Sequence, residues 1–222
     1  MKLIVLSCSK NEELFAPFSH CLEKYYPNHP KVIYFTDGIV NPYYKTIVVP
    51  HDINHWTTGL REFLSQIDDE QVLLMIDDCF IRRLVDRDRI KYASKHLIGK
   101  IACFNFEQSF DPSDEVTDLK GFKLRKHGSQ YEVSLMCGLW NRCKLINVLS
   151  QQDSDPWSVE YNQPNCGYDY YINSGDFIID WGYRTWKPAG IYKGKWCHEA
   201  KQFLDSIGIY PNYSIKGFSD IW

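Results

Sequence analysis

The chain has 222 residues, of which 44% are hydrophobic, so it can bury a core in one large domain or two small ones. Its net charge of −3 argues against a general electrostatic grip on nucleic acid, which is usually the property of a basic domain. No apolar stretch reaches the roughly 18 residues of a membrane span. The apolar run Leu3–Leu6 is too short for a signal peptide, and we expect it to begin a strand.

The first half of the chain alternates short aliphatic runs with amphipathic stretches. The pattern predicts strands at residues 3–7, 32–36, 45–49 and 72–76, and helices at 11–25 and 56–67. Pro17 is best tolerated near the start of the first helix, and Asn54 is a candidate cap for the second. This β-α-β-β-α-β order predicts an α/β fold, with a mostly parallel sheet and helices on its faces.

The second half of the chain is less regular. Residues 100–106 are expected to form a strand, and the polar, acidic run at 110–118 reads as a loop. Helices are predicted at 139–149 and at 196–207, the second closed by Gly208. Because no repeat, low-complexity tract or linker interrupts the sequence, we expect residues 1–222 to form a single domain.

The eight cysteines are scattered through the chain, without a Cys-x-x-Cys pair. In the absence of a secretion signal they predict free thiols in a reducing compartment, and therefore a cytoplasmic protein. Their spacing also argues against a structural zinc site. Aromatic residues make up 15% of the chain, which permits stacking on sugar rings or nucleobases without requiring it.

The most informative feature of the sequence is the pair Asp77-Asp78, which directly follows the buried run 72–76. Adjacent carboxylates at the end of a buried strand are costly unless a positive charge lies between them. That end of a strand is also where open α/β sheets bind ligands. A divalent cation carrying a diphosphate satisfies both conditions. The alternative is that the two acids only begin a surface loop and cap the next turn.

Several blocks in order along the chain resemble a group of small bacterial and phage-borne glycosyltransferases that includes enzymes of surface-polysaccharide clusters. The resemblance lies in residues 4–10, 15–26, 33–36, 73–81, 134–142, 155–160 and 190–196. It implies a GT-A fold, in which a Rossmann-like sheet binds a nucleotide-diphosphate sugar. The family often has Glu where this chain has Asp77, and an aromatic residue where it has Cys79.

By this resemblance Asp78 would ligate Mn²⁺ or Mg²⁺ and the donor diphosphate, with Asp77 on the ribose or on a metal-bound water. Both ions suit hard oxygen ligands. His198 is a second candidate metal or phosphate ligand. Residues 1–110 would form the donor-binding half of the domain, and residues 111–222 the acceptor side.

Glu160 is the candidate general base. Pro156 is expected to begin a helix, which places Glu160 in its first turns with Trp157 nearby. A carboxyl group beside an apolar indole can have a raised pKa, which suits a base for an acceptor hydroxyl. The alternative is an ordinary glutamate favoured by the helix dipole.

The other candidate residues would line the donor pocket. Lysines around a glycine at a helix start can grip a diphosphate, and the ends of the first two strands would hold the nucleoside. The alternatives are a solvated turn for the lysines, plain turn residues at the strand ends, and a core position for Trp56. These candidates are Ser7, Cys8, Lys10, Asp37, Trp56, Lys193 and Lys195.

The acceptor is open at this point. The resemblance favours a saccharide or glycolipid as the acceptor. We also expect inversion at the sugar carbon, because a lone base is sufficient for direct displacement. One alternative is modified DNA, with the basic residues between 82 and 91 and at 123–126 as a phosphate track, although solvated surface charge explains the same residues. Another alternative is a noncatalytic sugar- or nucleotide-binding module.

Overall fold

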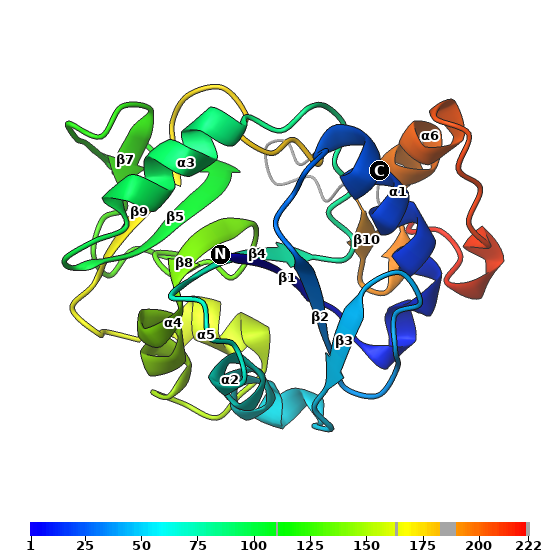
Figure 1. The fold of residues 1–222 in the computed structure, drawn as a ribbon, viewed down its shortest axis with the longest axis horizontal. Helices are drawn as coiled ribbons and strands as arrows, with labels where there is room; N and C mark the ends of the chain where they lie inside the picture. The colour runs from blue at the N-terminus through cyan, green and yellow to red at the C-terminus, as the bar shows by residue number, and fades with distance from the viewer. Residues whose placement is uncertain (110, 163, 183–189, 221–222) are drawn as a thin grey trace.

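A nine-stranded sheet forms the framework of the computed structural model, which describes residues 1–109, 111–162, 164–182 and 190–220 (Figure 1). Its strands, in chain order, are β1 (Lys2–Leu6), β2 (Val32–Thr36), β3 (Lys45–Val48), β4 (Gln71–Ile76), β5 (Ile101–Gln108), β6 (Glu115–Val116), β7 (Phe122–Leu124), β8 (Gly138–Asn141) and β9 (Asp169–Asn173). Their spatial order is β3-β2-β1-β4-β8-β5-β9-β7-β6. All of them run in one direction except β7 and β8, so the predicted α/β class with a mostly parallel sheet is confirmed.

Helices cover both faces of this sheet (Figure 1). One face carries α1 (Phe15–Tyr25), α3 (Arg87–His96) and α6 (His198–Ser206), and the other carries α2 (Trp56–Ser65), α4 (Arg142–Leu149) and α5 (Pro156–Asn162). Each set of helices shares a hydrophobic core with the sheet face that it covers. Within the described ranges, no helix is both long and apolar enough to cross a bilayer.

In the first half of the chain the four predicted strands form and α2 starts at Trp56 as predicted, but α3 was not predicted, and the start of the first helix and the cap before the second differ. A 3-10 helix, η1 (Ser9–Leu14), precedes α1, so the α-helix begins two residues before Pro17. Asn54 does not cap α2. Its backbone N–H instead donates to the Asp52 carboxylate at 2.8 Å, which caps the short 3-10 helix η2 (Ile53–His55) in front of α2.

Residues 138–141 are the clearest error of the sequence prediction. They form β8 rather than the first turn of a helix, and α4 begins only at Arg142, capped by Asn141. Strand β8 is antiparallel to both β4 and β5 and lies between them, which buries Trp140 completely. Gly138 suits this close packing, since a Cβ would lie 3.1 Å from Cys103 Sγ and 3.2 Å from the Phe104 carbonyl oxygen.

The last part of the chain also differs from its prediction. Lys195 and Trp196 do not start a helix. They form β11 (Lys195–Trp196), which pairs with β10 (Ile191–Tyr192) in a small hairpin, and α6 follows at His198. Gly208 closes α6 as predicted, with a φ of +81° just beyond the helix end. In the predicted loop at 110–118, the two-residue strand β6 pairs with β7, and Phe110 lies outside the described residues.

Candidate functional site

The acid pair lies where the sequence places it, immediately after β4 at the carboxyl edge of the parallel strands. Asp77 is fully buried. Ser7 Oγ donates to its Oδ2 at 2.5 Å, and Asn11 Nδ2 donates to its Oδ1 at 3.1 Å. Burial and the neighbouring Asp78 raise the pKa of Asp77 to about 8, against these two hydrogen bonds. Both oxygens of Asp77 are therefore already held by protein donors.

Asp78 is partly exposed and is closed in by the start of the β10–β11 hairpin. Its Oδ2 accepts from the Ile191 backbone N–H at 3.1 Å. Burial raises the pKa of Asp78, and this N–H opposes the rise. Gly190 approaches so closely that a Cβ there would lie 2.1 Å from the Asp78 carbonyl oxygen. A larger residue at position 190 would therefore prevent the close approach of the hairpin to Asp78.

Lys216 belongs to the same site, although no sequence pattern pointed to it. Its Nζ lies 2.5 Å from the Lys10 carbonyl oxygen, 3.1 Å from Asn11 Oδ1 and 3.0 Å from Glu13 Oε1. The contact with Glu13 is an ion pair without hydrogen-bond geometry, between side chains that are 9% and 8% exposed. Asn11 therefore connects the lysine to the Asp77 carboxylate, and the charge of Lys216 lowers the pKa of Asp77.

The residues predicted at the ends of β1 and β2 come together beside the acid pair. Asp37 accepts from the backbone N–H of Ser9 at 2.5 Å and from its hydroxyl at 3.3 Å, which ties the end of β2 to the start of η1. Cys8 is partly exposed, and burial is the main cause that raises the pKa of its thiol. Lys10 is exposed and contributes its carbonyl oxygen to Lys216.

Trp56 is not placed with these residues. Its side chain is only 8% exposed, and its ring packs edge-on against Phe35, with the ring centroids 6.3 Å apart, in the core under α2. Trp56 therefore occupies a core position, which was the alternative to lining the donor pocket. Little of the indole surface is left for a ligand.

The lysine pair sits in a different local structure from the one predicted. Lys193 and Gly194 form the turn of the β10–β11 hairpin, with φ values of 49° and 77°, rather than a helix start. Lys193 lies over the Tyr192 ring at 5.4 Å, and Lys195 is exposed on β11. The expected convergence of lysine charge and helix N–H groups is thus absent at these two residues.

His198 is the first residue of α6, and its exposed ring stacks on Phe218 with the ring centroids 4.9 Å apart. In the part of the chain that the structure describes, no group of three or more His, Cys, Asp or Glu side chains could hold a metal ion. Among the side chains that the structure describes, the Cys79 thiol lies 4.0 Å from the other oxygen of Asp78, Oδ1. A cation at this edge would therefore need most of its ligands from the substrate and from water.

A second cluster of carboxylates lines a cavity of about 230 Å³ beyond β8. The cavity is lined by Glu107, Gln108, Asp111, Asp114, Arg125, Gln130, Tyr131, Ser134, Met136, Glu160 and Ile172. Glu160 lies on α5 as predicted, and its Oε1 accepts from the Leu135 backbone N–H at 2.7 Å. Glu107, at the end of β5, accepts from Ser134 Oγ at 3.0 Å. The sequence analysis did not single out Glu107.

The pKa of Glu160 is raised, as expected for a general base, but the cause differs from the predicted contact with Trp157. Burial is the main cause that raises its pKa to about 7; the charge of Glu107 adds to the rise, and the Leu135 N–H opposes it. Trp157, which was expected to cause the shift, is 61% exposed. Burial also raises the pKa of Glu107, and Arg125 lowers the pKa of both acids.

The acid pair and the cavity lie along the same edge of the sheet. Because β8 runs against its neighbours, the residues that precede it enter at the carboxyl ends of β4 and β5. Burial raises the pKa of the Cys79 thiol, and the charges of Asp78 and Glu107 raise it further, so this thiol lies within the field of both acids. The structure therefore brings the acid pair after β4 and the carboxylates of the cavity to one edge of the sheet.

The basic residues proposed as a phosphate track are largely committed elsewhere. Arg83 pairs with Asp180 at 3.2 Å. Arg89 donates to the Gly121 carbonyl oxygen at 2.7 Å and to Asn173 Oδ1 at 2.8 Å, which holds the β7 and β9 ends together. Arg125 lines the cavity. These contacts favour a structural role for the three arginines.

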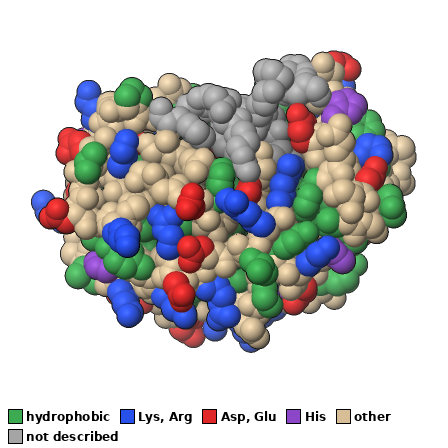
Figure 2. Space-filling model, turned by 90° about the horizontal axis from the view of Figure 1, so that it is seen from above, with side chains coloured by type: hydrophobic (Ala, Val, Ile, Leu, Met, Phe, Trp, Pro, Cys, Tyr) green, Lys and Arg blue, Asp and Glu red, His purple; other side chains and the backbone are tan. Residues whose placement is uncertain are grey.

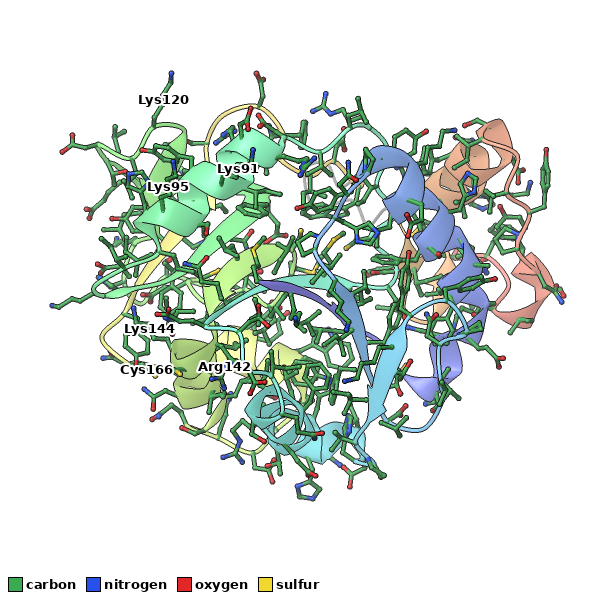
Figure 3. The ribbon with its side chains drawn as sticks, viewed as in Figure 1. Lys91, Lys95, Lys120, Arg142, Lys144 and Cys166 are labelled. Atoms are coloured by element: carbon green, nitrogen blue, oxygen red, sulfur yellow. The ribbon has the colours of Figure 1, made fainter. Side chains whose placement is uncertain are left out.

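The lysines do not form a continuous stripe either. Lys91 and Lys95 lie on α3 with Lys120 nearby, whereas Arg142 and Lys144 lie at α4, on the other side of the sheet (Figure 3). On the face seen in Figure 2, Lys and Arg side chains are interspersed with Asp and Glu. A duplex would meet charges of both signs on that face.

No protein-family model and no curated protein sequence matches this chain. Solved structures share its fold. They include a nucleotidyl transferase from Methanothermobacter (TM-score 0.53, 10% identity, covering 92% of this chain and 98% of that one). A CMP:2-keto-3-deoxy-manno-octonic acid synthetase complexed with CTP (TM-score 0.51, 13% identity, 78% and 89%) is another. S. aureus TarS also matches (TM-score 0.51, 13% identity, 93% and 39%).

At these identities the likeness shows the fold alone. This chain spans 39% of the length of TarS and 50% of the bifunctional IspDF from Campylobacter jejuni. The shared fold agrees with the α/β class read from the sequence.

Proposed function

We propose that this protein is a glycosyltransferase that moves one sugar from a nucleotide-diphosphate sugar to an acceptor hydroxyl. The observation that carries the proposal is the placement of two distinct acid sites on one sheet edge. Asp77 and Asp78 lie at the end of β4, and Glu160, with a pKa of about 7, lies in the adjoining cavity. Residues 1–222 would act as one domain. Glu107, from residues 1–110, lines the cavity, and Lys216, from residues 111–222, supports the acid pair. Both halves of the chain therefore contribute to each site.

On the donor side, Asp78 would hold Mn²⁺ or Mg²⁺ through Oδ1, with the donor diphosphate and water as the other ligands. Such sites commonly use one or two carboxylates together with substrate phosphates. When bound there, the cation would supply positive charge to the leaving diphosphate. Asp77, fixed by Ser7 and Asn11, would orient the ribose or a water, and Cys8, Lys10 and Asp37 would surround the nucleoside.

On the acceptor side, Glu160 would take the proton of the acceptor hydroxyl. The hydroxyl oxygen forms a bond to the anomeric carbon while the bond from that carbon to the diphosphate oxygen breaks, and the electron pair leaves with the nucleoside diphosphate. A carboxylate with a pKa near the working pH is well matched to this transfer. One base and direct displacement give inversion. The acceptor would be a saccharide or glycolipid, because Arg83 and Arg89, two of the residues considered for a DNA track, are engaged in protein contacts.

Nucleotidyl transfer is the second candidate, since two of the proteins with this fold are named as enzymes of that kind. It would need a close grip on a triphosphate, which glycine-rich loops commonly provide. The segment Ser7–Asn11 after β1 contains no glycine, and the first glycine of the chain is Gly38. We therefore favour glycosyl transfer.

The released product separates the two reactions. The protein is incubated with Mn²⁺ and a panel of nucleotide-diphosphate sugars, and in parallel with nucleoside triphosphates and sugars. Release of nucleoside diphosphate from the first panel is expected, and it should be lost in Asp78→Asn. Release of pyrophosphate from the second panel alone would replace the proposal by nucleotidyl transfer. Donor binding without turnover would favour a noncatalytic module.

A further inference from the structure

Three aromatic side chains form a platform beside the cavity. Trp157 and Tyr161 are 61% and 57% exposed, and they lie four residues apart on α5, which places them one turn apart on the same side of the helix. The Tyr131 ring packs against Tyr161 with the centroids 5.5 Å apart, and the two hydroxyl groups are 3.1 Å apart. Tyr131 has a φ of 61°, a backbone conformation that few residues other than glycine adopt.

The aromatic platform, meaning Trp157, Tyr161 and Tyr131, is continuous with the cavity. Tyr131 itself lines the cavity, and so does Glu160, which directly precedes Tyr161 on α5. A ligand that reaches Glu160 would therefore pass close to exposed ring faces. Large aromatic side chains left in water next to a polar pocket are a common feature of binding surfaces.

The charge of the cavity restricts what this ligand can be. Four carboxylates line it, from Glu107, Asp111, Asp114 and Glu160, against the single cation of Arg125. A phosphate or another anion would be repelled there. A neutral polyhydroxylated molecule would instead find many hydrogen-bond partners, because carboxyl groups accept from hydroxyl groups and, when protonated, also donate to them. Sugar rings also carry the apolar C–H faces that stack on aromatic rings.

Cavity size indicates how much of the ligand lies outside. Its volume of about 230 Å³ is below the roughly 300 Å³ at which typical small-molecule sites begin. We propose that the cavity takes the reacting ring of a neutral oligosaccharide acceptor and that the aromatic platform stacks the next ring. The acceptor is then a glycan of at least two rings. This inference rests on the proposed function and names its acceptor class.

Trp157 also makes the inference directly measurable. Among the tryptophans that the structure describes, it alone is exposed, so its fluorescence should respond to a sugar ring stacked on it. Neutral gluco-, galacto- and N-acetylhexosamine oligosaccharides of one to six rings are titrated onto the full chain. We expect binding of at least one series, with affinity rising about tenfold from one ring to two and little beyond three.

Substitutions in the aromatic platform test whether it binds the oligosaccharide. Trp157→Ala and Tyr161→Ala should each weaken binding of the oligosaccharide by about tenfold, read by calorimetry, without changing nucleotide-sugar binding or the urea midpoint. Tyr210→Ala is the matched control, because Tyr210 is 73% exposed and remote from the cavity lining, and it should change nothing. Trp157→Phe should remove the fluorescence response while keeping most of the affinity.

Three results would overturn the inference: no neutral oligosaccharide binds, one ring binds as well as two, or the alanine variants bind as tightly as the parent. Tighter binding of duplex DNA or of anionic lipid vesicles would also overturn it. The proposed function can fail independently of this inference. Platform-dependent glycan binding without any nucleotide-sugar turnover would show a glycan-binding protein that is not a transferase. Turnover that ignores the platform would leave a transferase with a different acceptor.

Discussion

Replacing Glu160 by glutamine should make the protein more stable above neutral pH while removing its transfer activity. Burial raises the pKa of Glu160 from its ordinary value of 4.5 to about 7. Because the folded-state pKa lies above the unfolded one, the folded protein holds this proton more tightly between the two values. The stability contributed by this proton is therefore fully present below about pH 4.5, and it is lost as the pH rises towards about 7.

The size of the effect follows from the shift. Each pKa unit corresponds to about 1.4 kcal/mol, so the wild-type carboxylate costs at most about 3 to 4 kcal/mol above pH 7. Partial exposure of the side chain brings the expected value closer to about 2 kcal/mol. Glutamine cannot ionise, and its amide oxygen can still accept from the Leu135 N–H. The variant should match the wild type at low pH and exceed it at high pH.

Urea unfolding at several pH values between 5 and 8 measures this difference, through the free energy of unfolding of both proteins. Acceptor-dependent turnover of Glu160→Gln should fall by about 100-fold or more, as expected for loss of a general base, while donor binding persists. Glu115→Gln, at an exposed position on β6, is the control and should leave the pH dependence unchanged. Parallel stability curves for wild type and Glu160→Gln would refute the burial argument, and full turnover would refute the base.

Three further changes test the surrounding contacts. Glu107→Gln should move the rise of the pH–rate profile to lower pH, because it removes a negative charge beside the proposed base. Lys216→Met should lower the free energy of unfolding by about 3 kcal/mol in urea titrations, since it leaves Glu13 buried and unpaired, and Glu13→Gln added to it should recover part of the loss. Gly190→Ala should abolish the Mn²⁺-dependent part of donor binding in calorimetry, because its Cβ would displace Asp78; unchanged binding would show that this contact is dispensable.

The first half of the fold could be predicted because its signals are local. Four aliphatic runs, each bounded by turn residues, became β1 to β4 with ends shifted by one residue at most. The position of Asp77 follows from the same logic, since an acid after a buried parallel strand must lie at its carboxyl edge. Helix α5 likewise began at Pro156, as the preference of proline for the first turn predicts.

The second half could not be predicted in the same way, because tertiary pairing decided it. Leu139 and Trp140 fit the apolar face of a helix as well as they fit a strand, and a short apolar run is ambiguous by periodicity alone. Strand β8 fills the gap between β4 and β5 and pairs with the backbone N–H and C=O groups of both neighbours. These groups would otherwise lack partners, which favours a strand over a helix here. Lys195 and Trp196 were misassigned for the same reason, as they pair with β10.

The supporting contacts of the site were invisible in the sequence because they join residues far apart along it. Ile191 donates to Asp78 across 113 positions, and Lys216 contacts Asn11 across 205. Nothing in the composition around position 216 distinguishes that lysine from a solvated one. Glu107 follows a strand, as Asp77 does, but as a single acid in a polar stretch it carried no comparable signal.

Strand β8, for which a helix was predicted, positions the residues that form the cavity. Because it runs against β4 and β5, the chain must arrive at the carboxyl edge of the sheet before it turns inward at Gly138. That arrival places Ser134 against Glu107 and the Leu135 N–H against Glu160. A parallel strand in the same place would deliver these residues to the opposite edge, away from Asp77. One reversed strand therefore brings Asp77, Asp78 and the carboxylates of the cavity to a single edge, which is the arrangement that the proposed transfer requires.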